Sequence, residues 1–225
     1  MKTRNFRFII YATTIQIILF SSFHYEINHL FFLYGVPLTR QMSFHMILMG
    51  YWYLPIFFIF HYFSEYISKA NDYQIMKMMK YGRYKYLSLK LCRLINELFI
   101  IVVLQILITV LLYQNHIEFN LLDIVRYYVV ILIIVLLENI LEFLFKRINI
   151  NIVINIFVIA SVIIYNFYPL TRDSFIKFVN MLMIVRIVDL TKIEVIGLAC
   201  ILFLLMLIIG YLLKRKDLLG DRNYD

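Results

Sequence analysis

Two glutamates toward one end of a long apolar stretch are the residues in this chain best suited to chemistry. Glu138 and Glu142 are one helical turn apart in a run of mostly Leu, Ile and Val. A charge at the bilayer centre costs about 2.5–3.5 kcal/mol on insertion scales, so each carboxylate requires a partner, a proton or contact with water. Lys146 follows Glu142 by four residues and is its predicted ion-pair partner. Glu138 has no basic neighbour on its own helix, so it either lines a path for substrate or protons, or bonds to a neighbouring span.

The sequence lacks the common catalytic motifs. No two of its six glycines have the GxxxxGK[ST] spacing of a P-loop, and neither an HExxH zinc motif nor a GxSxG nucleophile motif occurs. Cys92 and Cys200 lie in separate apolar stretches, which argues against a disulfide, and they form no paired metal spacing. We therefore expect no catalytic residue, no bound metal and no cofactor in this chain, and any ATP-driven work must use a partner.

Composition indicates the class of protein. The chain has 225 residues, of which 63% are hydrophobic, and a formal net charge of +8. A water-soluble domain of this size does not need so much apolar sequence, so we predict one multi-spanning membrane domain over residues 1–225. The positive charge gathers in connections expected to stay in the cytoplasm, which explains it without a nucleic-acid partner.

The apolar segments predict an all-α protein with six transmembrane helices. A bilayer requires about twenty apolar residues per helical span. The spans are expected at about 6–23, 44–66, 87–113, 122–145, 150–168 and 195–213. Basic residues alternate between connections, which places both termini in the cytoplasm. No small-residue cleavage site follows Phe20, so the first segment is expected to be a retained span rather than a cleaved signal peptide.

Aromatic and polar residues at the span ends have local interpretations. The cluster Tyr51, Trp52 and Tyr53 is expected in the aromatic belt at the outer interface, and Pro55 is expected to kink the second span. Glu97 follows Arg93 by four residues, which predicts an ion pair on one helix.

A strongly basic segment connects the second and third predicted spans. Asn71 or Asp72 can cap a helix, after which Ile75, Met78 and Met79 recur at the spacing of one helical face. A short cytoplasmic helix with a Met-rich face is suited to docking against another protein. The alternative is an amphipathic loop that lies on anionic lipid.

This segment continues without a break into the third span, so movement of the short helix would pass directly into the membrane. The residues assigned to this predicted coupling helix and its partner contact are Asp72, Ile75, Met76, Lys77, Met78, Met79, Lys80, Tyr81, Gly82, Arg83 and Lys85.

A second amphipathic segment is predicted between the fifth and sixth spans, on the outer side near the outer leaflet. Phe175, Phe178, Val179, Leu182 and Val185 form a helical apolar stripe there. It is expected to be an interfacial or re-entrant helix, or a short lid over neighbouring spans.

These features together resemble the membrane subunit, or permease, of a type-2 ABC exporter. The sequence MKMMKYGRYKYLSLKL resembles the coupling segment of small Firmicute permeases that handle bacteriocins, lantibiotics and cytolytic peptides, including phenol-soluble modulins. In this chain Gly82 is followed directly by Arg83, whereas many relatives have a small hydroxyl residue between the two. The amphipathic segment before the first span is also shorter than in larger relatives.

The resemblance implies a function and a set of partners. The chain would pair with a second membrane subunit, identical or homologous, above two cytoplasmic ABC ATPases that carry ATP and Mg²⁺. It would export amphipathic, antimicrobial or cytolytic peptides across the bacterial cell membrane, which can give self-immunity. The competing interpretations are an ATPase-independent membrane immunity protein that captures a toxic peptide, and a membrane peptide-processing enzyme that uses Cys92.

Overall fold

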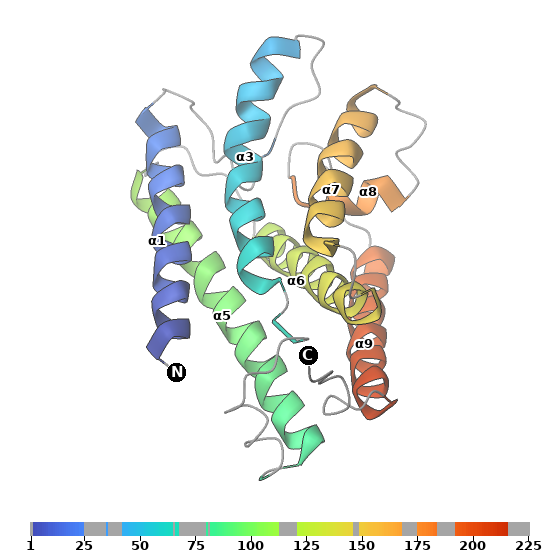
Figure 1. Cartoon of the computed structure of the whole chain (residues 1–225). Helices are drawn as coiled ribbons and strands as arrows, with labels where there is room; N and C mark the ends of the chain where they lie inside the picture. The colour runs from blue at the N-terminus through green and yellow to red at the C-terminus, as the bar shows by residue number, and fades with distance from the viewer. Residues whose placement is uncertain are drawn as a thin grey trace.

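The computed structural model describes residues 2–24, 35, 42–64, 66–67, 80, 82–112, 121–145, 149–167, 175–183 and 192–215. All regular structure within these ranges is helical, which confirms the predicted all-α class (Figure 1). The helices are α1 (Lys2–His24), α3 (Met42–Phe63), α5 (Arg83–Leu112), α6 (Leu121–Leu144), α7 (Ile150–Phe167), α8 (Phe175–Asn180) and α9 (Lys192–Arg215).

Two of these helices are long and apolar enough to cross a membrane. The qualifying segments are Lys85–Ile108 in α5 and Leu121–Leu144, which is the whole of α6. Shorter apolar segments occur in α1, α3, α7 and α9. The predicted apolar stretches therefore correspond to helices, whereas the count of six spans stays a prediction.

Helix α6 lies at the centre of the bundle. It packs against α7 and α9, and it also contacts α3 and α5, while α1 packs against α3 and α5. Figure 1 shows α5 running obliquely along the bundle from its lower end, where α1 also begins and α9 ends. This arrangement brings the polar residues of α3, α5, α6 and α7 toward one another.

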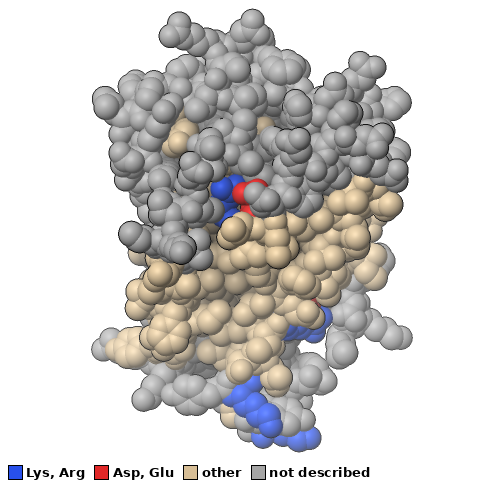
Figure 2. All heavy atoms as spheres, turned by 180° about the vertical axis from the view of Figure 1, so that it is seen from behind, with Lys and Arg blue, Asp and Glu red and all other residues tan. Residues whose placement is uncertain are grey.

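The bundle has an apolar exterior and a partly polar interior. Leu111, Leu121 and Phe203 are 67%, 77% and 64% exposed, whereas Glu138 and Gln105 are both fully buried. Figure 2 shows a broad band of one face without Lys, Arg, Asp or Glu, with basic side chains toward its lower margin. Large apolar side chains over so much of the surface are unusual for a water-soluble protein and are suited to an apolar solvent.

The start of α5 is determined by a glycine. Gly82 has a φ of 81°, a backbone conformation that side chains with a Cβ rarely adopt. Its carbonyl accepts the first bond of the helix from the Tyr86 N–H, at 3.1 Å. From this cap the helix continues for 30 residues, from the basic residues at its start into its apolar part.

The second predicted amphipathic segment forms a shorter helix than expected. Helix α8 covers only six residues and packs against α7. Val179 and Leu182 of the predicted stripe are both buried, and Val185 lies outside the described residues. The buried Met183 side chain occupies the space that a Cβ on Gly35 would need, so the segment after α8 touches the connection between α1 and α3.

The predicted aromatic belt is wrong for Trp52. Its side chain is fully buried in the bundle, and Tyr53 beside it hydrogen-bonds to Asn155 of α7. An aromatic belt requires side chains that reach the interface from the outside of a bundle, whereas this face of α3 is covered by other helices. Pro55 lies inside α3, which continues to Phe63.

Candidate functional site

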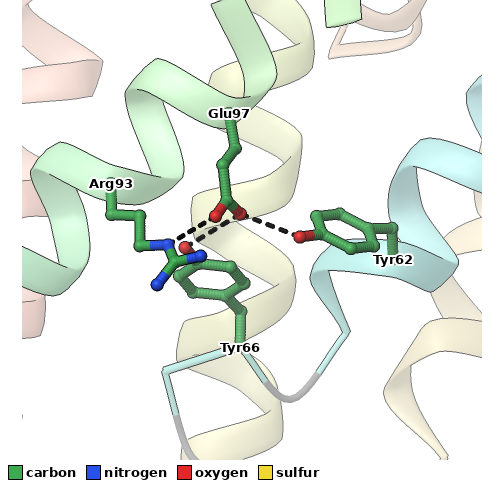
Figure 3. Close-up of polar contacts among 4 residues, drawn as sticks. All are labelled: Tyr62, Tyr66, Arg93 and Glu97. Atoms are coloured by element: carbon green, nitrogen blue, oxygen red, sulfur yellow. Dashed lines mark hydrogen bonds and ion pairs between the residues drawn. The ribbon is translucent and has the colours of Figure 1, made fainter. Parts of the chain in front are cut away.

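The first polar cluster joins the end of α3 to α5 (Figure 3). Tyr62 and Tyr66 both donate to Oε2 of Glu97, at 2.9 and 3.1 Å. Arg93 donates from Nε to Oε1 of the same carboxylate at 2.5 Å, which confirms the predicted i,i+4 pair. The charge on Glu97 is thus neutralised by Arg93 on the same helix. Its other oxygen, Oε2, accepts from Tyr62 and Tyr66 and so links α5 to the end of α3.

The turn that follows α3 is attached to α5 and α6. Lys90 of α5 donates to the carbonyl of Ile67 at 3.3 Å, and its ammonium lies 5.5 Å from the centre of the Tyr86 ring. Asn139 of α6 accepts from the Ile67 N–H at 2.9 Å and donates to the Phe63 carbonyl at 3.1 Å. A single amide side chain therefore pairs the Ile67 N–H and adds a second hydrogen bond to the Phe63 carbonyl, which also accepts from the Tyr66 N–H at 3.1 Å.

Glu142 also bonds to this turn. Ser64 donates to its Oε1 at 2.5 Å, across from α3 to α6. Lys146, the predicted partner of Glu142, lies outside the described residues. Together with Asn139, Glu142 makes the C-terminal part of α6 a docking face for Phe63, Ser64 and Ile67, and we call these contacts the α3 joint.

The second polar cluster is a chain of hydrogen bonds from α3 through α7 to α6. Tyr53 donates to Oδ1 of Asn155, and Asn155 donates to Oδ1 of Asn151 at 3.1 Å. Asn151 then donates to Oε1 of Glu138 at 2.7 Å. Glu138 is fully buried and bonds to Asn151 of the neighbouring helix α7, while its role in lining a path stays a prediction.

The structure describes only part of the predicted coupling segment. Lys80 is helical and exposed, Lys85 is exposed in the first turn of α5, and Arg83 is the first residue of that helix. The remaining assigned residues, other than Gly82, lie outside the described residues, and these are Asp72, Ile75, Met76, Lys77, Met78, Met79 and Tyr81.

Sequence reasoning missed the amide side chains. Asn139, Asn151 and Asn155 are each at most 7% exposed, and each lies in an otherwise apolar helix. Isolated polar residues in apolar segments usually face the bundle interior. The four-residue spacing of Asn151 and Asn155, which places them on one face of α7, was the signal that could have identified them.

The described residues contain no cluster of three or more His, Cys, Asp or Glu that could hold a metal ion. Cys92 and Cys200 are free thiols, as expected, and both are exposed. The site is thus a set of buried hydrogen bonds between helices, and the arrangement can hold helices in register, accommodate polar groups inside an apolar bundle and bind a proton.

Together, the fold and the site define an all-helical protein with an apolar exterior and buried polar joints between its helices. The chain belongs to the family described as protein of unknown function (DUF2705), whose sequence pattern matches residues 9–219. No curated protein and no solved structure matches the chain.

Proposed function

We propose that this protein is the membrane subunit of an ATP-driven ABC transporter that exports amphipathic antimicrobial or cytolytic peptides, with self-immunity as one consequence. The observation that carries the proposal is the unbroken helix α5, which begins directly after the basic residues around Lys80 and Gly82. Its 30 residues correspond to about 45 Å at 1.5 Å per residue, more than the roughly 30 Å of a hydrocarbon core. A push at its first turn would therefore reach across the membrane.

The α3 joint supports a second route for the same movement. The segment between α3 and α5 starts at residues 64–67, where Glu142, Asn139 and Lys90 bind the turn. Displacement of this segment would pull on α6 as well as on α5. A partner ATPase that moves the segment would thus act on the central helix of the bundle.

A six-span arrangement with cytoplasmic termini is part of the proposal. Helices α1, α3, α7 and α9 have 23, 22, 18 and 24 residues, within the range of about 17–25 that crosses a bilayer. The contact of Gly35 with Met183 supports a common outer side for the two connections that contain them. The exposed side chains of Lys80 and Lys85 would lie on the inner side.

Export of an amphipathic peptide would use both the apolar and the polar side chains of the bundle. An amphipathic peptide requires a route with both kinds of wall, and the interior supplies Tyr, Asn and Glu side chains among apolar ones. In this scheme two membrane subunits stand above two cytoplasmic ATPases, and ATP and Mg²⁺ bind only to the ATPases.

Purification of the tagged protein from its native membrane tests the proposal. We expect a soluble protein of ATPase size to co-purify in a stoichiometric amount, and the complex to hydrolyse ATP. A preparation that contains no such ATPase would contradict the proposal. Immunity by capture would instead protect cells when ATP hydrolysis is blocked, and a peptidase would lose activity in a Cys92→Ser variant.

Charge reversal tests the coupling residues. The double variant Arg83→Glu and Lys85→Glu should insert into the membrane normally but uncouple ATP hydrolysis from peptide export, because both residues lie in the first turn of α5. The matched control is Arg7→Glu, which reverses an exposed charge on α1. Unchanged export by the double variant would remove these residues from the coupling path.

A further inference from the structure

Glu138 has one carboxylate oxygen without a partner. Its side chain is fully buried, and Oε1 accepts from Asn151 at 2.7 Å. Oε2 is buried as well and has no hydrogen-bond partner among the described residues. Buried polar atoms are nearly always paired, so this oxygen requires an explanation.

Among the described residues, the groups hydrogen-bonded to Glu138 or next in its chain carry no positive charge, and the basic side chains Lys90 and Arg93 of α5 are bonded to the Ile67 carbonyl and to Glu97. Asn151 and Asn155 come from α7, and Tyr53 comes from α3. On its own helix the nearest ionisable group is Glu142, one turn away and bonded to Ser64. Helix α9 also packs on α6, and the titratable side chains described there, Cys200 and Tyr211, are exposed.

The hydrogen bonds around Glu138 all point toward it. Tyr53 donates to Asn155, Asn155 donates to Asn151, and Asn151 donates to Glu138. The chain ends on Oε1, which can accept both as a carboxylate oxygen and as the carbonyl oxygen of a carboxylic acid. Protonation of Oε2 therefore leaves every one of these bonds intact.

We propose that Glu138 is a proton-binding site and that its Oε2 carries a proton in this arrangement of helices. An ionised carboxylate that is buried without a cation is far more costly than a neutral acid, and a second negative charge at Glu142 would add to that cost. A proton removes the charge without requiring space for a larger ion. The same reasoning holds whether or not the bundle transports peptides.

Proton release follows from separation of α6 and α7. When water reaches Glu138, the Oε2–H bond breaks, the proton passes to water and the carboxylate keeps the electron pair. The charged form is then stable only while the site stays wet. Proton binding and the packing of α6 on α7 are therefore linked, and each favours the other.

Infrared spectroscopy of the purified full-length protein in lipid nanodiscs tests the assignment. A protonated carboxyl group has a carbonyl stretching band separate from that of a carboxylate, and labelling of glutamate with ¹³C identifies the residue type. We expect the wild type to show a protonated-glutamate band at neutral pH. The band should be absent in Glu138→Gln and retained in the control variant Glu142→Gln.

A second variant tests the same assignment if Glu138→Gln folds poorly. Tyr53→Phe removes the first donor of the chain, so the polarisation at Glu138 weakens and the band should shift in frequency while keeping its intensity. Absence of the band in the wild type, or its persistence in a folded Glu138→Gln variant, would overturn the assignment. Neither result depends on an ATPase, so failure of the transport proposal would be recognised separately.

Discussion

Glu97 controls the connection between α3 and α5 at the residue scale. It accepts from Arg93 on its own helix and from Tyr62 and Tyr66 across the interface. The Arg93 bond was predictable because both residues are on one helix at a fixed spacing. The two tyrosines were not predictable, because their position opposite Glu97 depends on how α3 packs against α5.

Replacement of Glu97 by Gln should lower stability. Gln cannot neutralise Arg93, and it offers one oxygen in place of two for the three donors. Hydrogen bonds to charged groups contribute about 1.5–3 kcal/mol each, so we expect a loss of about that size in the free energy of unfolding. Thermal unfolding in detergent measures it. Cys92→Ser, an exposed change on the same helix, is the control, and an equal melting temperature for both variants would contradict this account.

Asn139 gives a second prediction at this scale. The variant Asn139→Leu keeps a similar side-chain volume but leaves the Ile67 N–H and the Phe63 carbonyl without this partner. The Phe63 carbonyl keeps its bond from the Tyr66 N–H, whereas an unpaired Ile67 N–H costs about 1–3 kcal/mol and should exchange its hydrogen faster. Hydrogen-exchange mass spectrometry follows that amide. In the control Ser161→Ala, which removes a bond within α7, exchange at Ile67 should stay unchanged.

At the scale of the elements, the helices agree closely with the apolar segments of the sequence. The segment predicted at 122–145 is α6, Leu121–Leu144, and that predicted at 150–168 is α7, Ile150–Phe167. Such boundaries follow from local composition and capping. The extent of α8 was not evident in the same way, because its apolar stripe continues beyond the point where the helix ends at Asn180.

Two glycines test how local conformation positions the elements. In Gly82→Ala the only expected cost is the unfavourable φ, which destabilises the fold by roughly 1–2 kcal/mol, because a Cβ at this position has open space around it. Ala at Gly35 also overlaps with Met183. We therefore expect Gly35→Ala to lower the melting temperature more than Gly82→Ala.

The double variant Gly35→Ala with Met183→Gly separates the two effects at this position. Removal of the Met183 Cβ, Cγ and Sδ atoms, all of which a Cβ on Gly35 would overlap, should make the cost of the Gly35 change smaller than in the wild-type background. A strictly additive loss in the double variant would show that this contact does not determine the cost.

At the scale of the whole molecule, the exposed apolar side chains and the buried polar joints both indicate an apolar solvent around the bundle. Exposed Leu, Ile and Phe side chains cover α5, α7 and α9, while the polar joints lie between helices. With α6 at the centre, the α3 joint and the Glu138 chain attach to the same helix within a few turns. Movement at the α3 joint would thus also displace the part of α6 that carries Glu138.

Cysteine labelling tests the orientation of the bundle. In a background with Cys92→Ser and Cys200→Ser, a cysteine at Lys85 should resist a membrane-impermeant thiol reagent in intact cells, because it would lie on the cytoplasmic side. A cysteine at Leu121, the exposed first residue of α6, should react. The reverse pattern would place the basic segment outside and refute the proposed coupling path.

The sequence by itself determined the helical class, the positions of the long apolar helices and the Arg93–Glu97 pair, because composition and short spacings act locally. Only the tertiary structure decided which polar residues meet. Asn139 binds Ile67, which is 72 positions away, and Tyr53 binds Asn155, which is 102 positions away. Such pairs depend on which faces of the helices are turned inward, and in these nearly uniformly apolar segments the hydrophobic pattern barely distinguishes one face from another.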